Sequence, residues 1–190
     1  YLRMNQNPYR YPNAWSTDWR STIIQETAEW VVVNKPAAVP MQAGVSNLHE
    51  NVFAQLQREL SGESDDSVRK LYVTGRLDVC TTGVCLLAKS KRAVAAAHAA
   101  LRNNEVQKEY LALTAAPVPL GTMRHAYKKT QGGQAPTLLR PYTKALESSA
   151  ESPWKLAALE VLRCKAGNWT WPSDAGSRKL YEVHIKLLTG

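Results

Sequence analysis

The sequence has few cysteines and no long apolar run. Its 3 cysteines, an odd number, do not fit the disulfide framework of a small secreted protein, so we expect a reducing intracellular compartment, the cytoplasm or an organelle. We expect Cys80, Cys85 and Cys164 to be small buried apolar residues. No apolar stretch reaches the about 18–20 residues that cross a bilayer, so we expect no membrane partner. The sequence begins at Tyr1, and a targeting segment could precede it.

Several motifs of common enzyme classes are also missing. The sequence contains no G-x-G-x-x-G, no G-x-x-x-x-G-K-[ST], no H-E-x-x-H and no G-x-S-x-G. Their absence argues against the nucleotide-binding and zinc-protease classes. Cys80 and Cys85 lack a second Cys or His pair at the spacing of metal ligands. We therefore expect neither a metal nor a cofactor.

Positive charge, by contrast, is in excess. The sequence has 24 Lys and Arg against 16 Asp and Glu, which gives a formal net charge of +8. A field of this sign attracts polyanions, so nucleic acid is the first class of partner to consider. The 190 residues, 44% of them hydrophobic, are enough for one domain with a buried core.

The pattern of apolar residues predicts an α+β fold with a mixed, mainly antiparallel sheet and helices packed on it, because strands outnumber helices and most connections are too short for parallel crossovers. We expect an extended, aromatic-rich arm over residues 1–29 and a catalytic domain over residues 30–190. A capping box, Asn47 with Glu50, predicts the start of a helix that ends near Gly62. Ser90 is expected to cap a second helix, which ends at 103–104. The predicted strands are 30–33, buried on both faces, 71–74, 83–88, 105–114, 155–164 and 181–187, with a long basic loop or hairpin over 115–153.

An arginine and an aspartate interrupt two apolar strands at G-R-L-D, residues 75–78. A carboxylate on a loop between two core strands is expected to be partly desolvated, and a neighbouring cation is then needed to keep it ionised. For an isolated R-x-D, a structural ion pair or a local turn would explain the two residues. Asp78 is therefore the first candidate for a functional carboxylate.

Three segments in order resemble the RluA family of pseudouridine synthases, whose chains show N-K-P-A-G, then H-R-L-D-x-x-T-S-G, then K-x-Y. Residues 29–44 read E-W-V-V-V-N-K-P-A-A-V-P-M-Q-A-G, residues 71–89 read L-Y-V-T-G-R-L-D-V-C-T-T-G-V-C-L-L-A-K, and residues 106–114 read V-Q-K-E-Y-L-A-L-T. The final segment, residues 179–190, looks like the approach to the family's fourth motif, T-G-R-x-H-Q-I-R. The resemblance spans the chain from about Trp30 to its last residue.

The sequence departs from the family pattern at three positions. Gly75 stands where the family usually has His, Thr82 where it has Ser, and Ala38 where it has Gly. The family's arginine after T-G, which pairs with the catalytic aspartate, would follow Gly190. On the resemblance we expect these 190 residues to be a fragment with little or no turnover of their own.

The resemblance implies a role for each residue of the site. Asp78 would act at the sugar, either by attacking the anomeric carbon or by removing the adjacent ribose proton. Tyr110 would stack on the extruded base, and Arg76 would fill or open the helix that the target uridine leaves. The simpler interpretation of Tyr110 is a core tyrosine, and that of Arg76 is a salt-bridge partner of an acidic residue. Lys35 and Pro36 are interpreted as architectural.

The basic loop is expected to supply phosphate contacts to RNA, either rRNA or tRNA, for which we name Arg124, Lys128 and Lys129, together with His125 and Arg140. Each of these residues could equally belong to an ordinary solvated surface. We expect a monomer. Two alternatives to an RNA pseudouridine synthase stay open: a non-catalytic RNA-binding relative of the family, and a basic interaction module that would leave the buried R-L-D unexplained.

Overall fold

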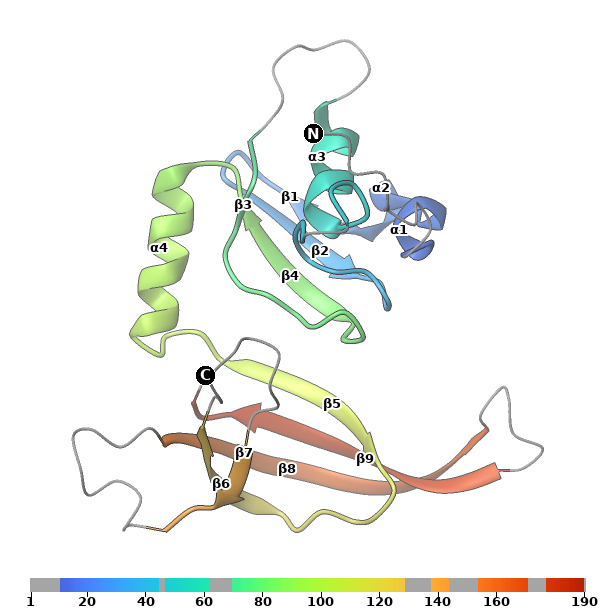
Figure 1. The fold of residues 1–190 in the computed structure, drawn as a ribbon, viewed down its shortest axis with the longest axis vertical. Helices are drawn as coiled ribbons and strands as arrows, with labels where there is room; N and C mark the ends of the chain where they lie inside the picture. The colour runs from blue at the N-terminus through green and yellow to red at the C-terminus, as the bar shows by residue number, and fades with distance from the viewer. Residues whose placement is uncertain are drawn as a thin grey trace. The chain divides into compact units, whose positions relative to one another are not determined.

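The computed structural model describes residues 11–44, 47–61, 70–128, 138–143, 154–170 and 177–189. The chain divides into two units, Tyr1–Glu105 and Val106–Gly190. Each unit has its own sheet, of four strands in the first and five in the second (Figure 1). The units are taken in turn below.

The sheet of the first unit has the strand order β1-β2-β4-β3, and all of its pairings are antiparallel. Burial alternates along the central strand: Val31 and Val33 are buried, whereas Trp30 and Val32 are partly exposed. The prediction of a strand here is confirmed, but its two faces are not covered equally. The strands are β1 (Ile23–Glu26), β2 (Trp30–Lys35), β3 (Tyr72–Val73) and β4 (Gly83–Ala88).

Helix α3 (Val52–Ser61) supplies the other half of the core, with Val52, Leu56 and Leu60 on its buried face. The helix begins four residues later than the capping box predicted. The side chain of Asn51, not that of Asn47, accepts a hydrogen bond from the Ala54 amide, at 2.9 Å, and so caps the first turn. Asn47 instead accepts from the Gly44 amide and shapes the loop before the helix.

Residues 11–26 do not form the extended arm that was predicted for residues 1–29. They fold into α1 (Asn13–Ser16), α2 (Trp19–Thr22) and β1. Pro12 already has helical dihedral angles, and a proline costs nothing at a helix start because the first amides have no helical partner. Asp18 caps α2 through the Ser21 amide, and the Trp19 indole donates to the Ala14 carbonyl at 2.8 Å within the core. Trp19 therefore serves packing, whereas Trp15 is exposed.

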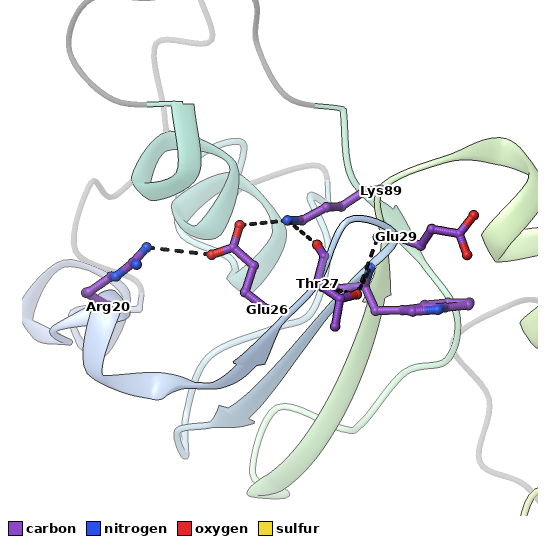
Figure 2. Close-up of polar contacts among 6 residues, drawn as sticks. Arg20, Glu26, Thr27, Glu29 and Lys89 are labelled. Carbon is purple, nitrogen blue, oxygen red and sulfur yellow. Dashed lines mark hydrogen bonds and ion pairs between the residues drawn. The ribbon is translucent and has the colours of Figure 1, made fainter.

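A polar network fixes the turn between β1 and β2 (Figure 2). Lys89, just after β4, donates to the Glu26 carboxylate at 2.6 Å and to the Thr27 carbonyl at 2.7 Å. The Thr27 hydroxyl accepts from the Trp30 amide at 3.0 Å. Arg20 lies 3.8 Å from Glu26 on the other side. The turn and the end of β1 are thus tied to the end of β4 and to α2.

Helix α4 (Lys91–Arg102) follows β4 and contacts β3 and β4. Ser90 caps it by accepting from the Ala93 amide, as the sequence predicted. Asn104, with φ 56°, ends it in the left-handed conformation that asparagine tolerates.

The sheet of the second unit has the order β5-β9-β8-β6-β7, again antiparallel throughout. The stretch 115–153, predicted as a long basic loop or hairpin, contains two paired strands. β8 and β9 are both longer than predicted, and a bulge interrupts their register between Val161 and Arg163. The strands are β5 (Lys108–Thr114), β6 (Gly121–Lys128), β7 (Leu138–Pro141), β8 (Lys155–Thr170) and β9 (Ser177–Leu187). The predicted α+β class with mainly antiparallel strands is confirmed.

Candidate active site

The loop between β3 and β4 carries Arg76 and Asp78 and is anchored at both ends. Thr74 is buried, and its hydroxyl donates to the Leu86 carbonyl of β4 at 2.7 Å. Near the other end, the Thr81 amide donates to the Asp78 carbonyl at 3.1 Å and closes a turn. Arg76 and Asp78 themselves are exposed. The expected desolvation of Asp78 was wrong, because β3 ends at Val73 and the loop then runs over the surface.

Lys35, the last residue of β2, holds this loop from beneath. Its side chain is fully buried, with 0% of its surface exposed. The ammonium group donates to three backbone carbonyls: Thr81 at 2.8 Å, Pro36 at 3.0 Å and Val79 at 3.1 Å. Two of these carbonyls belong to the loop that carries Asp78. A single cation therefore links the end of β2 to the Asp78 loop.

Burial and nearby side chains together set the pKa of Lys35. Burial removes water from the ammonium group and lowers the pKa of Lys35, while the charges of Cys85, Cys80 and Asp78 oppose this shift. Lys35, interpreted from the sequence as architectural, is thus a buried cation whose ammonium is hydrogen-bonded to the loop that carries Asp78. Its signal was present in the sequence, since Lys35 is a charged residue at the end of a buried β-branched run.

Tyr110 lies on β5 in the second unit, where it pairs with Ile185 of β9 and is partly exposed. Lys108 and Ala112 share its face of the sheet, since alternate residues of a strand point the same way. This position fits both the stacking role and the simpler interpretation as a core tyrosine. The predicted site residues therefore come from both units: Arg76 and Asp78 from the first and Tyr110 from the second.

Two of the three predicted RNA contacts can be placed. Arg124 and Lys128 lie four residues apart on β6 and so share one face of its sheet. Arg124 is exposed and Lys128 partly exposed. Lys129 lies outside the described residues.

The three cysteines, all expected to be buried, differ in their exposure. Cys85 on β4 is buried as expected, with its thiol 3.5 Å from the Met41 sulfur. Cys80, on the Asp78 loop, is exposed, so that prediction was wrong, and Cys164 is intermediate. Within the described parts of the chain, no three His, Cys, Asp or Glu side chains are grouped to hold a metal ion. The same residues include no helix long and apolar enough to cross a membrane.

Comparison with known families decides the assignment. The family model described as RNA pseudouridylate synthase matches residues 29–190. This chain belongs to the RNA pseudouridylate synthase family. The resemblance to RluA-type enzymes, carried by N-K-P, R-L-D and K-E-Y, is thereby confirmed.

Two plant members of the family align with the whole chain. RNA pseudouridine synthase 6, chloroplastic, of Arabidopsis thaliana is 34% identical over 203 residues, which cover 100% of this chain and 40% of that protein. The protein of the same name from Oryza sativa subsp. japonica is 30% identical over 207 residues and covers 100% of this chain and 39% of its own length. The chain thus spans about two fifths of the length of these relatives.

Solved structures of the family share the fold. Human RNA Pseudouridylate Synthase Domain Containing 1 superimposes with a TM-score of 0.58 at 22% identity, covering 89% of this chain and 60% of that one. Human RNA Pseudouridylate Synthase Domain Containing 4 gives a TM-score of 0.57 at 18% identity, with 96% of this chain and 64% of that one covered. The mixed helical and antiparallel architecture is that of pseudouridine synthase domains.

The departures from the family pattern have different structural consequences. Ala38, where the family has Gly, adopts φ 60°, in the region that disfavours side chains. At Gly75, where the family has His, an added Cβ would meet no atom within 4 Å, so the backbone leaves room for a larger residue. Gly83, which the family pattern retains, has φ +117°, a conformation that favours glycine.

Proposed function

We propose that this chain carries the catalytic centre of an RNA pseudouridine synthase that isomerises uridine to pseudouridine in structured RNA, with Asp78 as the catalytic residue. The observation that supports this most is the placement of Asp78. The family's aspartate position falls on an exposed loop whose backbone is held by the buried Lys35 ammonium. A catalytic carboxylate needs a fixed backbone and open access to substrate, and this loop provides both.

The reaction requires that uracil be detached from ribose, turned and rejoined through carbon. Asp78 would act at the sugar, as nucleophile at the anomeric carbon or as base toward the adjacent ribose proton, and both routes need an ionised carboxylate. Tyr110 would stack on the extruded base, and Arg76 would occupy the gap that the uridine leaves.

Several features of the relatives bear on the substrate and location. The family match begins at residue 29, which supports a catalytic domain that starts near Trp30. Relatives named Ribosomal large subunit pseudouridine synthase C, from Buchnera aphidicola and Haemophilus ducreyi, favour rRNA over tRNA as the substrate. The two plant relatives are named chloroplastic, which supports a plastid location. We further propose that the protein acts as a monomer and takes no cofactor or metal.

Tritium release tests the proposal directly. RNA transcribed with uridine tritiated at C5 loses the label when the base is rejoined through that carbon. Both variants are made in the complete protein. We expect Asp78→Asn to abolish release from a transcript that the parental complete protein modifies, and Glu59→Gln, a change of an exposed carboxylate on α3, to release tritium at the parental rate. Parental turnover by Asp78→Asn would overturn the catalytic assignment. RNA binding without tritium release by the parental protein would point to a non-catalytic relative of the family.

A further inference from the structure

One face of the second unit's sheet gathers cations around a tryptophan. Arg124 and Lys128 lie on this face of β6, and Ala126 lies between them. Arg140 of β7 is paired directly opposite Ala126, and directly paired residues share a face. Three positive side chains therefore surround Ala126. We call Arg124, Lys128, Arg140 and Trp154 the Trp154 surface.

Trp154 joins this group from the start of β8. Lys155 pairs with Tyr127 on the opposite face, so the residue before it turns toward Arg124 and Lys128. The Arg140 guanidinium carbon lies 4.9 Å from the centroid of the Trp154 ring, in a cation–π contact. Trp154 and Tyr142 are both partly exposed. Ala126 is only 2% exposed, so larger side chains cover this small residue.

The charge of the surface is one-sided. Its three cations are Arg124, Arg140 and Lys128. Glu160 of β8 lies on the same face, where it pairs with Thr122, two residues from Arg124 and six from Lys128. Arg124 and Lys128 are about 13 Å apart along the strand, since a strand rises about 3.3 Å per residue. That span can follow an RNA backbone past the tryptophan.

We propose that the Trp154 surface binds a single-stranded segment of RNA, with an unpaired base stacked on the Trp154–Arg140 pair and flanking phosphates at Arg124 and Lys128. An indole ring and a guanidinium plane offer flat faces for a base, whereas a duplex keeps its base faces covered. This assigns a subsite for RNA other than the target uridine. The choice of RNA rests on the proposed function.

The competing explanation is purely structural: Trp154 and Arg140 would serve only to cover Ala126. The two explanations differ in what they predict for strandedness. If the two side chains only cover Ala126, the protein has no preference for unpaired RNA. Removing either side chain then lowers the unfolding free energy and leaves RNA affinity unchanged. A stacking role gives a preference for single strands that depends on the ring.

Fluorescence anisotropy with a labelled RNA of about 12 nucleotides, free or annealed to its complement, separates them. Stacking contributes about 1–3 kcal/mol per base, so Trp154→Leu should weaken single-strand binding roughly 5- to 150-fold and leave duplex binding unchanged. Trp154→Phe should restore most of the loss. Arg140→Gln should also weaken single-strand binding. Trp15→Leu and Arg20→Gln, which change exposed residues of the first unit, serve as controls and should bind as the parental protein does.

Equal losses for single strand and duplex, or parental affinity in Trp154→Leu and Arg140→Gln, would overturn the proposal. If Trp154→Leu does not fold, Trp154→Phe and Arg140→Gln decide the question. Binding is measured without turnover, so the outcome is independent of Asp78. Failure here with Asp78-dependent tritium release would remove the subsite only, and failure of tritium release with intact strand preference would remove only the proposed function.

Discussion

The ammonium of Lys35 lies 2.8 Å from the carbonyl oxygen of Thr81, three residues beyond Asp78. A buried cation on β2 thus fixes backbone on the loop between β3 and β4. The two segments are more than forty residues apart in sequence. The position of the Asp78 loop is consequently sensitive to the side chain at residue 35.

Replacing Lys35 with Met should loosen this loop. The variant keeps a long side chain and avoids the cost of burying a charge, but it leaves the Pro36, Val79 and Thr81 carbonyls without their donor. We expect a loss of about 1–3 kcal/mol in unfolding free energy and faster hydrogen exchange of the loop amides. Lys91→Met, at an exposed position on α4, should change neither. Parental exchange rates in Lys35→Met would contradict the role assigned to this lysine.

Ala38→Gly should stabilise the protein. Ala38 is exposed and has φ 60°, a conformation that costs a residue with a Cβ about 1–2 kcal/mol. The greater freedom of glycine in the unfolded chain offsets part of this gain, so we expect a net increase of up to about 1 kcal/mol in unfolding free energy.

The converse change is Gly83→Ala. Its φ of +117° is strained for alanine although no atom lies within 4 Å of the added Cβ. Denaturant titration should show a loss of about 1–3 kcal/mol. The unfolding free energy should therefore rise in Ala38→Gly and fall in Gly83→Ala. A lower unfolding free energy in Ala38→Gly would be incompatible with the positive φ at residue 38.

Stability should fall in alkaline solution through Cys85. Burial raises the pKa of the Cys85 thiol from 9.0 to about 11. In the unfolded chain the thiol ionises at a lower pH than in the folded protein. The contribution of the buried neutral thiol to the unfolding free energy is therefore complete below pH 9.0 and is lost as the pH rises through about 11. The contribution is roughly 2–3 kcal/mol. The difference in unfolding free energy between the parental protein and Cys85→Ala should shrink by that amount over this range, and a constant difference would contradict it.

RNA affinity should fall steeply with added salt. The logarithm of the binding constant is expected to be linear in the logarithm of salt concentration, with a slope of about −0.7 per neutralised phosphate of a single strand. Arg124→Gln should reduce the slope by about one such step, whereas Arg20→Gln should leave it unchanged. A flat salt response of the parental protein would exclude phosphate contacts as a source of affinity.

Much of the fold follows from local pattern. Ser90 was identified as a cap because its side chain and the following apolar spacing are local signals, and the structure confirms it. The helix start at Asn51 was missed because Asn47 with Glu50 offers the same chemistry four residues earlier. Only the tertiary contacts choose between them: the Val52 and Phe53 amides donate to the Pro40 and Met41 carbonyls.

The site was less accessible to sequence reasoning. Asp78 was singled out because it interrupts two apolar strands, whereas Arg76 and Tyr110 were assigned through family motifs, and the roles of all three stay predictions. The three-carbonyl contact of Lys35 could not be foreseen, because its partners at Val79 and Thr81 are backbone atoms that carry no residue-specific signal. Trp154 was missed for a similar reason. Its proximity to Arg140 depends on the pairing of β6 with β7 and β8, which periodicity along one strand does not give.

The strand order of the second unit also sets the order in which its sheet can be assembled. β8 and β9 are neighbours in the chain and lie at the centre of the sheet, so they can pair as a local hairpin. β5 comes first in the unit, yet its only partner among the described strands is β9, the last. During synthesis β5 must therefore wait with both edges unpaired until the end of the unit has left the ribosome. Pairing of β5 with β9 is a long-range, slow step. Until it occurs, the unpaired edges of β5 can aggregate or bind chaperones.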